Sequence, residues 1–448
     1  MPRIFFGNFE FEHELARGQS GDLPRTAPGE LLAAGAGSLS DRAWVWTAIA
    51  EPGDVVVING EMPAAEFSPL AELGLSIPQF CGAAERLPRG SDWELVPWGW
   101  TESLLRRAKE HGWTAAAPPA DVVCRVNSRE FRFGLERDWN IGLEQAAIAR
   151  SLNDLDAVVA SSGENPRGWL LKANYGMSGR EAMRGRGRNL EGNIHNWAVK
   201  RLASNGPIIF EPIVERIAEA GIQLEIPSNG APRLMGVTPL LVDTSGVYRG
   251  SRFGCLPEEI ACWQPAVDVA LRAALELQRL GYFGPLGIDA MLYRDAAGEV
   301  RLRPLQDLNA RWTMGRLALG FCRLLGGGGA SRDGRAGTAE SEYIVTSPPL
   351  TPLYEGGDAS GETNQWCGSW LHFSGLRLGK LSVAEWLHAL ERHLPGGAIA
   401  VPASPRSARS NSPCGVLVLA PSPQVRNIAE ATLFNHLTPQ AIRLSTEY

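Results

Sequence analysis

Residues 285–315 constrain the fold of this chain most strongly, because they read as two short apolar runs separated by a polar, turn-like segment at 295–299. Two such runs around a turn predict a β-hairpin. Hairpin pairing would bring together oxygen-bearing side chains from both runs, with an arginine just beyond them: Asp289, Asp307, Asn309 and Arg311.

This set of side chains suggests a cation site. Hard cations such as Mg²⁺ prefer oxygen ligands and usually share them with a phosphate. A magnesium-nucleotide site is therefore the first hypothesis. An ordinary exposed hairpin with polar ends explains the same residues equally well, because an acidic hairpin has little specificity as a motif.

Composition narrows the class of protein. The length of 448 residues suggests two to four domains, and the net charge of −6 gives no reason to expect nucleic-acid binding. The seven cysteines are scattered and odd in number, which argues against a zinc site or disulfide framework and fits a reducing cytoplasm. The N-terminal run lacks the apolar core of a signal peptide, and no stretch approaches the length of a membrane span. We expect a cytoplasmic protein with neither membrane nor nucleic-acid partners.

Apolar runs and helical periodicity predict the order of elements along the chain. A Pro-rich patch at 117–120 marks a boundary after an α/β segment, and Gly/Ser/Arg-rich stretches separate the C-terminal part. The expected strands lie at 3–6, 54–59, 122–126, 169–172, 208–211, 222–226 and 415–420, and the expected helices at 98–110, 264–280 and 383–393.

Lys172 ends the apolar strand WLLK, and the glycine-containing loop NYGMSGRE follows at once. Glycines let backbone N–H groups approach phosphate oxygens closely, and a lysine at the strand end supplies a point charge. The lysine precedes the glycines, so this is not the Walker pattern. A surface turn after an edge strand is the alternative.

The segment IFEPIVE at 209–215 is a plausible adenine hinge. The carbonyl of Pro212 could accept from the adenine amino group, and the N–H of Val214 could donate to a ring nitrogen. Glu215 or Glu219 could accept from the ribose hydroxyls. A strand end with solvated glutamates is the alternative.

The order of these features resembles the ATP-grasp superfamily, in which the nucleotide lies between two α+β subdomains. The resemblance covers residues 121–325 and implies a mixed α/β and α+β fold with an N-terminal α/β pre-grasp domain. The corresponding boundaries are 1–120 for the pre-grasp domain, 121–205 and 206–325 for the two subdomains, 326–340 for a flexible linker and 341–448 for a C-terminal α+β segment.

The resemblance also implies roles for individual residues. Lys172 and Arg129 match phosphate-binding positions. The family often has lysine at the position of Arg129, and arginine keeps the positive charge. The remaining matches are Ser178, Gly179 and Arg180 in the loop that closes over the phosphates, Glu211, Pro212 and Val214 at the adenine hinge, Glu215 at the ribose, and Asp289, Asp307 and Asn309 at the metal. Arg311 would stabilise charge on the transferring phosphoryl group. Arg252 is a second candidate for that task, and Arg249 competes with it.

Asp307 departs from the family, which usually has glutamate there, one methylene longer. The activity implied is that of an ATP-dependent carboxylate–amine ligase that forms an acylphosphate, with ATP and one or two Mg²⁺ ions as cofactors. The arginine-dense loop 180–188 is either a lid or a solvated mobile loop. As a lid, it would suit a small-molecule substrate with several carboxylates, such as a glutamyl compound, and an amine partner. A non-catalytic nucleotide-binding scaffold and a small-molecule kinase are the alternative functions, and homo-oligomerisation is open.

Overall fold

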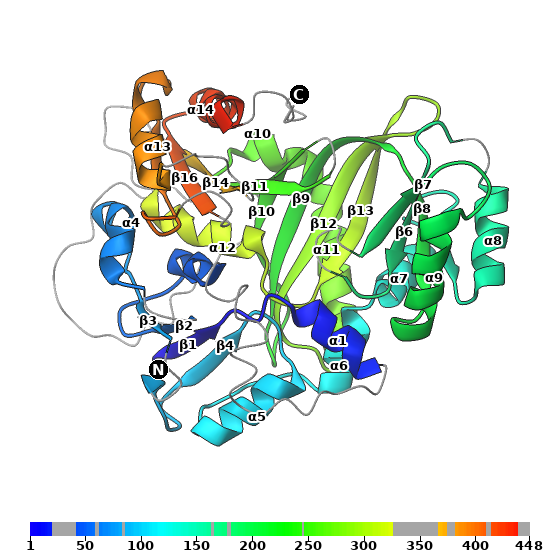
Figure 1. Cartoon of the computed structure of the whole chain (residues 1–448), viewed down its shortest axis with the longest axis horizontal. Helices are drawn as coiled ribbons and strands as arrows, with labels where there is room; N and C mark the ends of the chain where they lie inside the picture. The colour runs from blue at the N-terminus through cyan, green and yellow to red at the C-terminus, as the bar shows by residue number, and fades with distance from the viewer. Residues whose placement is uncertain are drawn as a thin grey trace.

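The computed structural model describes residues 1–19, 42–58, 62–82, 86–162, 165–176, 181–243, 246–325, 366–373, 381–408 and 414–437. Within these ranges the chain forms three β-sheets, two of four strands and one of eight. Figure 1 shows the N-terminal sheet at lower left, the eight-stranded sheet through the centre and the second small sheet at right.

The N-terminal sheet is parallel, with strand order β3-β2-β1-β4. Its strands are β1 (Arg3–Phe6), β2 (Val55–Val57), β3 (Gln79–Cys81) and β4 (Glu94–Pro97). The strand expected at 3–6 is confirmed. Of the residues expected as a strand at 54–59, Val55–Val57 form β2. Helix α5 (Glu102–His111) begins later than the expected 98–110, because the Thr101 side chain caps it by accepting from the Leu104 N–H.

Smaller elements complete this N-terminal part. They are α1 (Phe11–Gln19), η1 (Ala43–Ala48), η2 (Ala64–Phe67) and α4 (Ser68–Glu72). All of η1 is buried, although its sequence AWVWTA forms only a 3₁₀-helix. Its tryptophans therefore serve as core residues that attach the parallel sheet to the rest of the molecule.

The strand expected at 122–126 is wrong, because those residues belong to helix α6 (Ala120–Val126). Val123 and Val126, three residues apart, are both buried, so one helical face packs into the core despite the β-branched composition. Helix α7 (Arg129–Trp139) follows, and the Ser128 side chain caps it by accepting from the Phe131 N–H.

The second small sheet is antiparallel, with strand order β5-β8-β6-β7. Its strands are β5 (Ala147–Ala149), β6 (Trp169–Ala173), β7 (Ala182–Gly185) and β8 (Ile208–Pro212), and the helices α8 (Leu152–Ser161) and α9 (Gly192–Ser204) pack with it. The strands expected at 169–172 and 208–211 are confirmed. Leu170 pairs with Glu211, so Glu211 and Lys172 project from the same face of adjacent strands.

The eight-stranded sheet is antiparallel throughout, in the order β13-β12-β9-β10-β11-β14-β16-β15. Its strands are β9 (Glu215–Ile226), β10 (Arg233–Val242), β11 (Tyr248–Phe253), β12 (Gly284–Arg294), β13 (Val300–Asn309), β14 (Cys367–Phe373), β15 (Ile399–Pro402) and β16 (Cys414–Ala420). The β12–β13 hairpin and the strands expected at 222–226 and 415–420 are confirmed. The C-terminal strands extend the same sheet, and the domain boundaries remain predictions, with 326–340 outside the described residues.

Helices cover both faces of this sheet. The apolar residues Ile222 and Leu224 of β9 pack with α11 (Gln264–Arg279), which matches the helix expected at 264–280. Between them, Gln223 faces the other side and accepts from Thr313 at the start of α12 (Met314–Gly320). The remaining elements are α10 (Pro257–Ile260), η4 (Ala261–Trp263), η5 (Phe321–Leu324), α13 (Val383–Leu390), η6 (Glu391–His393) and α14 (Pro423–Leu437), and α13 with η6 covers the helix expected at 383–393. Among the described helices, none combines the length and apolar character that crossing a bilayer requires.

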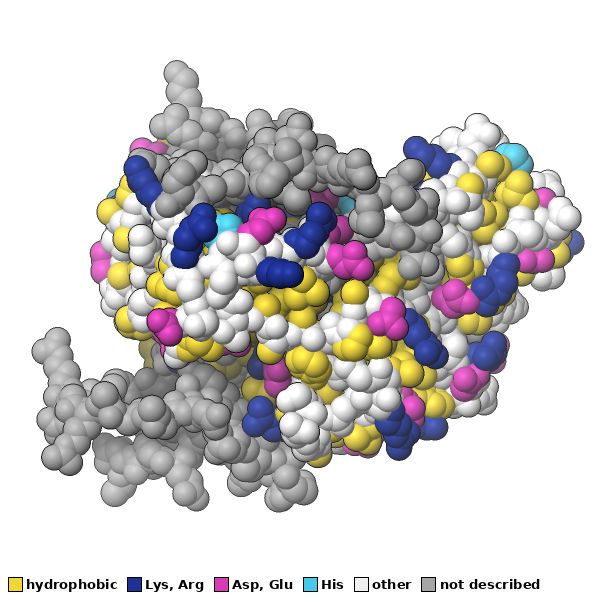
Figure 2. All heavy atoms as spheres, turned by 90° about the horizontal axis from the view of Figure 1, so that it is seen from below, with side chains coloured by type: hydrophobic (Ala, Val, Ile, Leu, Met, Phe, Trp, Pro, Cys, Tyr) yellow, Lys and Arg dark blue, Asp and Glu magenta, His cyan; other side chains and the backbone are white. Residues whose placement is uncertain are grey.

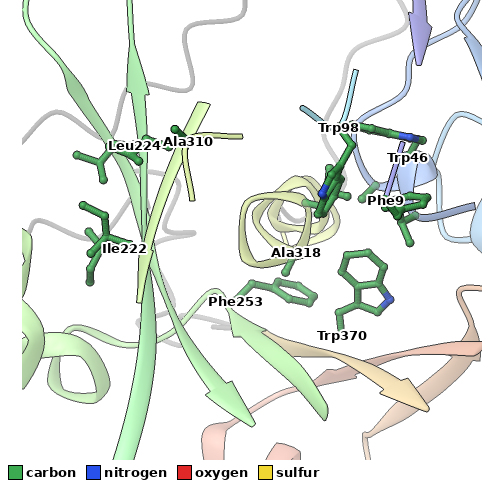
Figure 3. Close-up of a cluster of buried hydrophobic side chains, with 14 of the residues drawn as sticks. Phe9, Trp46, Trp98, Ile222, Leu224, Phe253, Ala310, Ala318 and Trp370 are labelled. Atoms are coloured by element: carbon green, nitrogen blue, oxygen red, sulfur yellow. The ribbon is translucent and has the colours of Figure 1, made fainter. Parts of the chain in front are cut away.

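Aromatic side chains join the N-terminal part to the large sheet around α12, as Figure 3 shows for Trp46, Trp98, Phe253 and Trp370. The rings of Trp46 and Trp98 meet edge to face at 6.1 Å, and Trp370 meets Phe321 in the same way at 5.3 Å. Such pairs add to the stabilisation from burial. The two parts therefore share one continuous core.

Trp370→Ala should lower the free energy of unfolding by about 3–5 kcal/mol, because it removes a large side chain that is only 1% exposed. Chemical denaturation followed by circular dichroism measures this change. Leu275→Ala on the exposed side of α11 is the control and should change stability by about 0.5 kcal/mol or less. Equal losses in the two variants would contradict a shared core at Trp370.

Candidate active site

The predicted metal residues lie together at the end of the β12–β13 hairpin. Asp289 pairs directly with Asp307, and Gly287 pairs with Asn309, so the three polar side chains project from one face. The Asn309 side-chain amide lies 3.5 Å from Asp289 Oδ2 as a donor. The hairpin expected from the sequence therefore places these oxygens as proposed.

The early cationic residues converge on the same place. Arg129 at the start of α7 lies with its Nη2 atom 3.9 Å from Asp307 Oδ2. Burial raises the pKa of Asp307, but Arg129 and Lys172 outweigh that effect and hold it below its ordinary value. Lys172 and Asp307 are thus close enough to interact, although they come from different sheets.

Arg129 also shapes the start of the glycine-containing loop. It donates to the carbonyl oxygens of Ala173 at 2.6 Å and Gly176 at 3.0 Å. A Cβ atom at Gly176 would lie 2.5 Å from the Glu181 side chain, so only glycine fits this close approach. Ser178, Gly179 and Arg180 fall outside the described residues, and their roles remain predictions.

Behind Lys172 lies a buried ion network of five side chains, which are Lys172, Glu211, Arg132, Glu136 and Arg303. Lys172 Nζ lies 2.8 Å from Glu211 Oε2, and Arg132 donates to Glu211 Oε1 at 3.0 Å. Arg303 on β13 binds both carboxylates, with Nε 2.7 Å from Glu136 and Nη2 2.7 Å from Glu211. Arg132 also pairs with Glu136, one helical turn away.

Burial and the contacts within this network shift the pKa values of Glu211 and Lys172. Burial raises the pKa of Glu211, yet the adjacent Arg303, Lys172 and Arg132 bring it well below its ordinary value. Burial lowers the pKa of Lys172, and Glu211 partly offsets that effect. Glu211 is only 3% exposed, so it is not the solvated strand-end glutamate of the alternative interpretation.

The rest of the predicted hinge follows Glu211 in the connection from β8 to β9. Pro212 ends β8, and Val214 immediately precedes β9. Glu215 is half exposed and lies 2.5 Å from Arg167 and 3.7 Å from Arg294, whereas Glu219 is buried and accepts from Gln306. The adenine and ribose roles remain predictions.

The donor set at the hairpin fits Mg²⁺. Burial, Asp307 and Glu219 raise the pKa of Asp289 to about 7, and a bound cation would relieve this repulsion. In the described part of the chain, no group of three or more His, Cys, Asp or Glu side chains is arranged to hold a metal. Asp289, Asp307 and the Asn309 amide offer two carboxylates and one neutral oxygen on one face of the hairpin. A Mg²⁺ ion held by them would take its other ligands from phosphate and water.

The two candidate arginines lie in different environments. Arg311 donates at 2.9 Å to Oδ1 of Asn309, which is one of the predicted metal residues. Arg252 lies elsewhere: it binds Glu430 of α14 through Nε at 3.1 Å and Nη2 at 2.7 Å. Strand pairing from β12 through β9 and β10 to β11 puts Asp289 and Ser251 on the same face of the sheet. Arg252, the next residue along β11, therefore projects from the opposite face. The competing Arg249 is bound to Asp243 at 2.7 Å.

Glu12 of α1 also reaches this arrangement, where it accepts from Arg311 Nε at 2.7 Å. Four residues of the arrangement were not singled out from the sequence, namely Arg132, Glu136, Arg303 and Glu12. The spacing of Arg132 and Glu136 is that of a helical i,i+4 ion pair, which is the signal available in advance. Such pairs are usually solvated, and nothing in the local sequence shows that Arg303 buries this one.

Comparisons with known proteins agree with this fold. No protein-family model matches the chain. The butirosin acyl-carrier protein–L-glutamate ligase of Niallia circulans is 26% identical over 278 residues, which cover 59% of this chain and 62% of that protein, so the chain matches less than two thirds of its relative's length. N5-carboxyaminoimidazole ribonucleotide synthetase from Thermus thermophilus superposes with a TM-score of 0.50 at 14% identity, covering 98% of this chain and 99% of that one. The ATP complex of the synthase from Aspergillus clavatus gives 0.49 at 10% identity, with coverage of 98% and 99%. The superposition on the Thermus thermophilus enzyme confirms the expected fold class.

Glu211→Gln should lower the free energy of unfolding by about 3–5 kcal/mol, because it leaves buried cations without their shared carboxylate. The exposed pair of Glu276 with Arg279 provides the control, and Glu276→Gln should cost about 1 kcal/mol or less. Denaturant titration at neutral pH measures both changes.

The effect of Glu211→Gln on the free energy of unfolding should depend on pH. The folded pKa of Glu211 is depressed, so its contribution is fully present above the unfolded pKa of about 4.3 and is lost as the pH falls through the folded value. The stability difference between the wild type and Glu211→Gln should be constant above about pH 5 and should narrow below it. A difference that grows on acidification would contradict an ionised Glu211.

Proposed function

We propose that this chain, whose fold is that of the ATP-grasp superfamily, is an ATP-dependent carboxylate–amine ligase. One observation carries the proposal: a lysine and an arginine from the small antiparallel sheet and α7 meet two carboxylates and an amide from the β12–β13 hairpin. Lys172 and Arg129 would bind phosphate oxygens, and Asp289, Asp307 and Asn309 would hold Mg²⁺. The bound cation would supply charge neutralisation at the phosphates.

The chemistry has two steps. A carboxylate oxygen of the substrate attacks the γ-phosphorus of ATP, and the bond to the bridging oxygen breaks to give an acylphosphate and ADP. An amine nitrogen then attacks the acyl carbon, inorganic phosphate leaves, and the nitrogen loses a proton. The first step brings two anions together, and their repulsion at about 4 Å is roughly 4 kcal/mol at an effective dielectric near 20. Arg311, which donates to Asn309, would offset part of this repulsion.

We propose L-glutamate as the carboxylate substrate, since the Niallia circulans relative is named as a glutamate ligase. That relative's name gives an acyl-carrier protein as its other substrate, and an amine presented by a carrier is the corresponding acceptor here. Arg184, Arg186 and Arg188, all exposed on or after β7, would favour an acidic substrate or partner. We also propose a reducing compartment such as the cytoplasm, because the seven cysteines are scattered along the sequence and odd in number.

The purified chain should convert ATP, Mg²⁺, L-glutamate and hydroxylamine into ADP, phosphate and a glutamyl hydroxamate, because hydroxylamine can replace the amine. Coupled ADP detection and the coloured iron–hydroxamate complex measure the two products. A ligase retains its acylphosphate, so ADP release should stop after about one turnover when hydroxylamine is omitted.

The omissions separate the alternative functions. A kinase would continue to release ADP without hydroxylamine, and a non-catalytic nucleotide-binding scaffold would release none with any combination. Because the carboxylate is proposed from one relative, L-aspartate and D-glutamate serve as matched substrate controls. Equal rates with all three would contradict glutamate specificity while leaving the ligase assignment in place.

Asp289→Asn and Asp307→Asn should each lower hydroxamate formation at least about 100-fold, because each removes an anionic ligand of the cation that neutralises the phosphates. Asp295→Asn, in the turn of the same hairpin, is the matched control and should retain activity. Circular dichroism and the unfolding midpoint check that the fold is intact. Wild-type turnover in both site variants would remove the metal assignment.

A further inference from the structure

We propose that Glu12, in the first turn of α1, is a positioning residue that holds Arg311 beside the metal residue Asn309. The inference rests on the proposed phosphoryl transfer and adds to it a residue from outside the two nucleotide-binding subdomains. The observation that carries it is a buried, charged contact between positions 299 residues apart in the sequence.

The contact fixes the guanidinium group of Arg311 from several sides. Glu12 is 5% exposed, and its Oε1 atom accepts from Arg311 Nε at 2.7 Å and lies 2.5 Å from Nη2. Nη1 donates to the carbonyl oxygen of Trp312 at 2.9 Å, and Nη2 donates to Asn309 Oδ1 at 2.9 Å. The ring of Trp98 lies 5.4 Å from the guanidinium carbon.

These contacts leave Arg311 with one orientation, in which Nη2 links Glu12 to Asn309. A guanidinium group needs fixed partners to present its donors in one direction, because its long side chain otherwise has many rotamers. Without Glu12, the remaining partners are two neutral oxygens and an aromatic face. Among the described residues, Glu12 is thus the one carboxylate within hydrogen-bonding distance of Arg311.

Helix α1 is placed to connect the whole site. The residue after Glu12, His13, lies 3.8 Å from Glu181, which precedes β7 in the small antiparallel sheet. Adjacent residues of one helix therefore lie against Arg311, just after the hairpin, and against Glu181, just before β7 of the sheet that carries Lys172. The N-terminal part contributes directly to the site rather than only supporting it.

The test compares Glu12→Gln, which keeps the size but removes the charge, with Asp54→Asn. Asp54 is a matched control because it is a buried carboxylate of the same N-terminal part and binds an arginine, Arg3, at 2.6 Å, away from the hairpin. Calorimetry gives the affinities for MgADP and for MgADP with aluminium fluoride, which mimics the transferring phosphoryl group. The hydroxamate assay gives kcat and KM.

Glu12→Gln should weaken binding of the aluminium fluoride complex and lower kcat, each by about tenfold or more, while changing MgADP affinity by about twofold or less. Asp54→Asn should change neither the affinity for the aluminium fluoride complex nor kcat. Glu12→Asp should lose less than Glu12→Gln, because the negative charge is retained. Unchanged binding of the mimic, or a parallel loss of MgADP and mimic affinity, would overturn the proposal.

The two readouts separate failure of this proposal from failure of the proposed function. If the wild type forms no hydroxamate but binds the mimic more tightly than MgADP alone, the ligase assignment fails while the comparison of affinities still tests Glu12. If Glu12→Gln does not fold, Glu12→Asp and Arg311→Lys replace it, and each should reduce affinity for the mimic selectively. A wild type with equal affinity for both ligands would overturn the role of Arg311, and the role of Glu12 with it.

Discussion

The rest of the site depends on the ion pairs that the buried carboxylate of Glu211 forms. This carboxylate binds Lys172 of β6, Arg132 of α7 and Arg303 of β13, so one side chain connects the small sheet to the large one. Three cations and two carboxylates, counting Glu136, leave one net positive charge in a nearly dry environment. Buried charge of this kind is costly unless it is paired, and an anionic ligand such as a phosphate would complete the pairing.

The attachment of the N-terminal part has a different physical basis. Aromatic rings around α12 supply non-directional burial, which stabilises the contact without specifying the orientation of any polar group. The pair of Glu12 with Arg311 supplies the direction, since it aligns a guanidinium group against Asn309. Packing and charge therefore act together at this junction, and a site residue depends on a helix that is distant in the sequence.

The sequence allowed prediction wherever a pattern was local. The hairpin around 295–299, the strand ending near Lys172 and helix α11 follow from short periodicities, and their relative order implied the fold. Helix α6 was mistaken for a strand because its burial depends on tertiary packing that overrides β-branched propensity. The buried ion network depends on contacts between residues far apart in the sequence, and so does the pairing of β14, β15 and β16 with the large sheet. The local sequence does not show which distant partner a charged or apolar residue will meet.

The two paired carboxylates of the hairpin have pKa values that their neighbours shift in opposite directions. Asp307 lies within reach of Arg129 and Lys172, which lower its pKa, whereas burial, Asp307 and Glu219 raise that of Asp289. A phosphate would engage the cations that now stabilise Asp307, and the freed carboxylate would then need a cation of its own. Because the same cation would relieve the repulsion at Asp289, nucleotide and Mg²⁺ should bind cooperatively at this hairpin. The shorter aspartate is compatible with this arrangement, since it already lies directly across the hairpin from its partner.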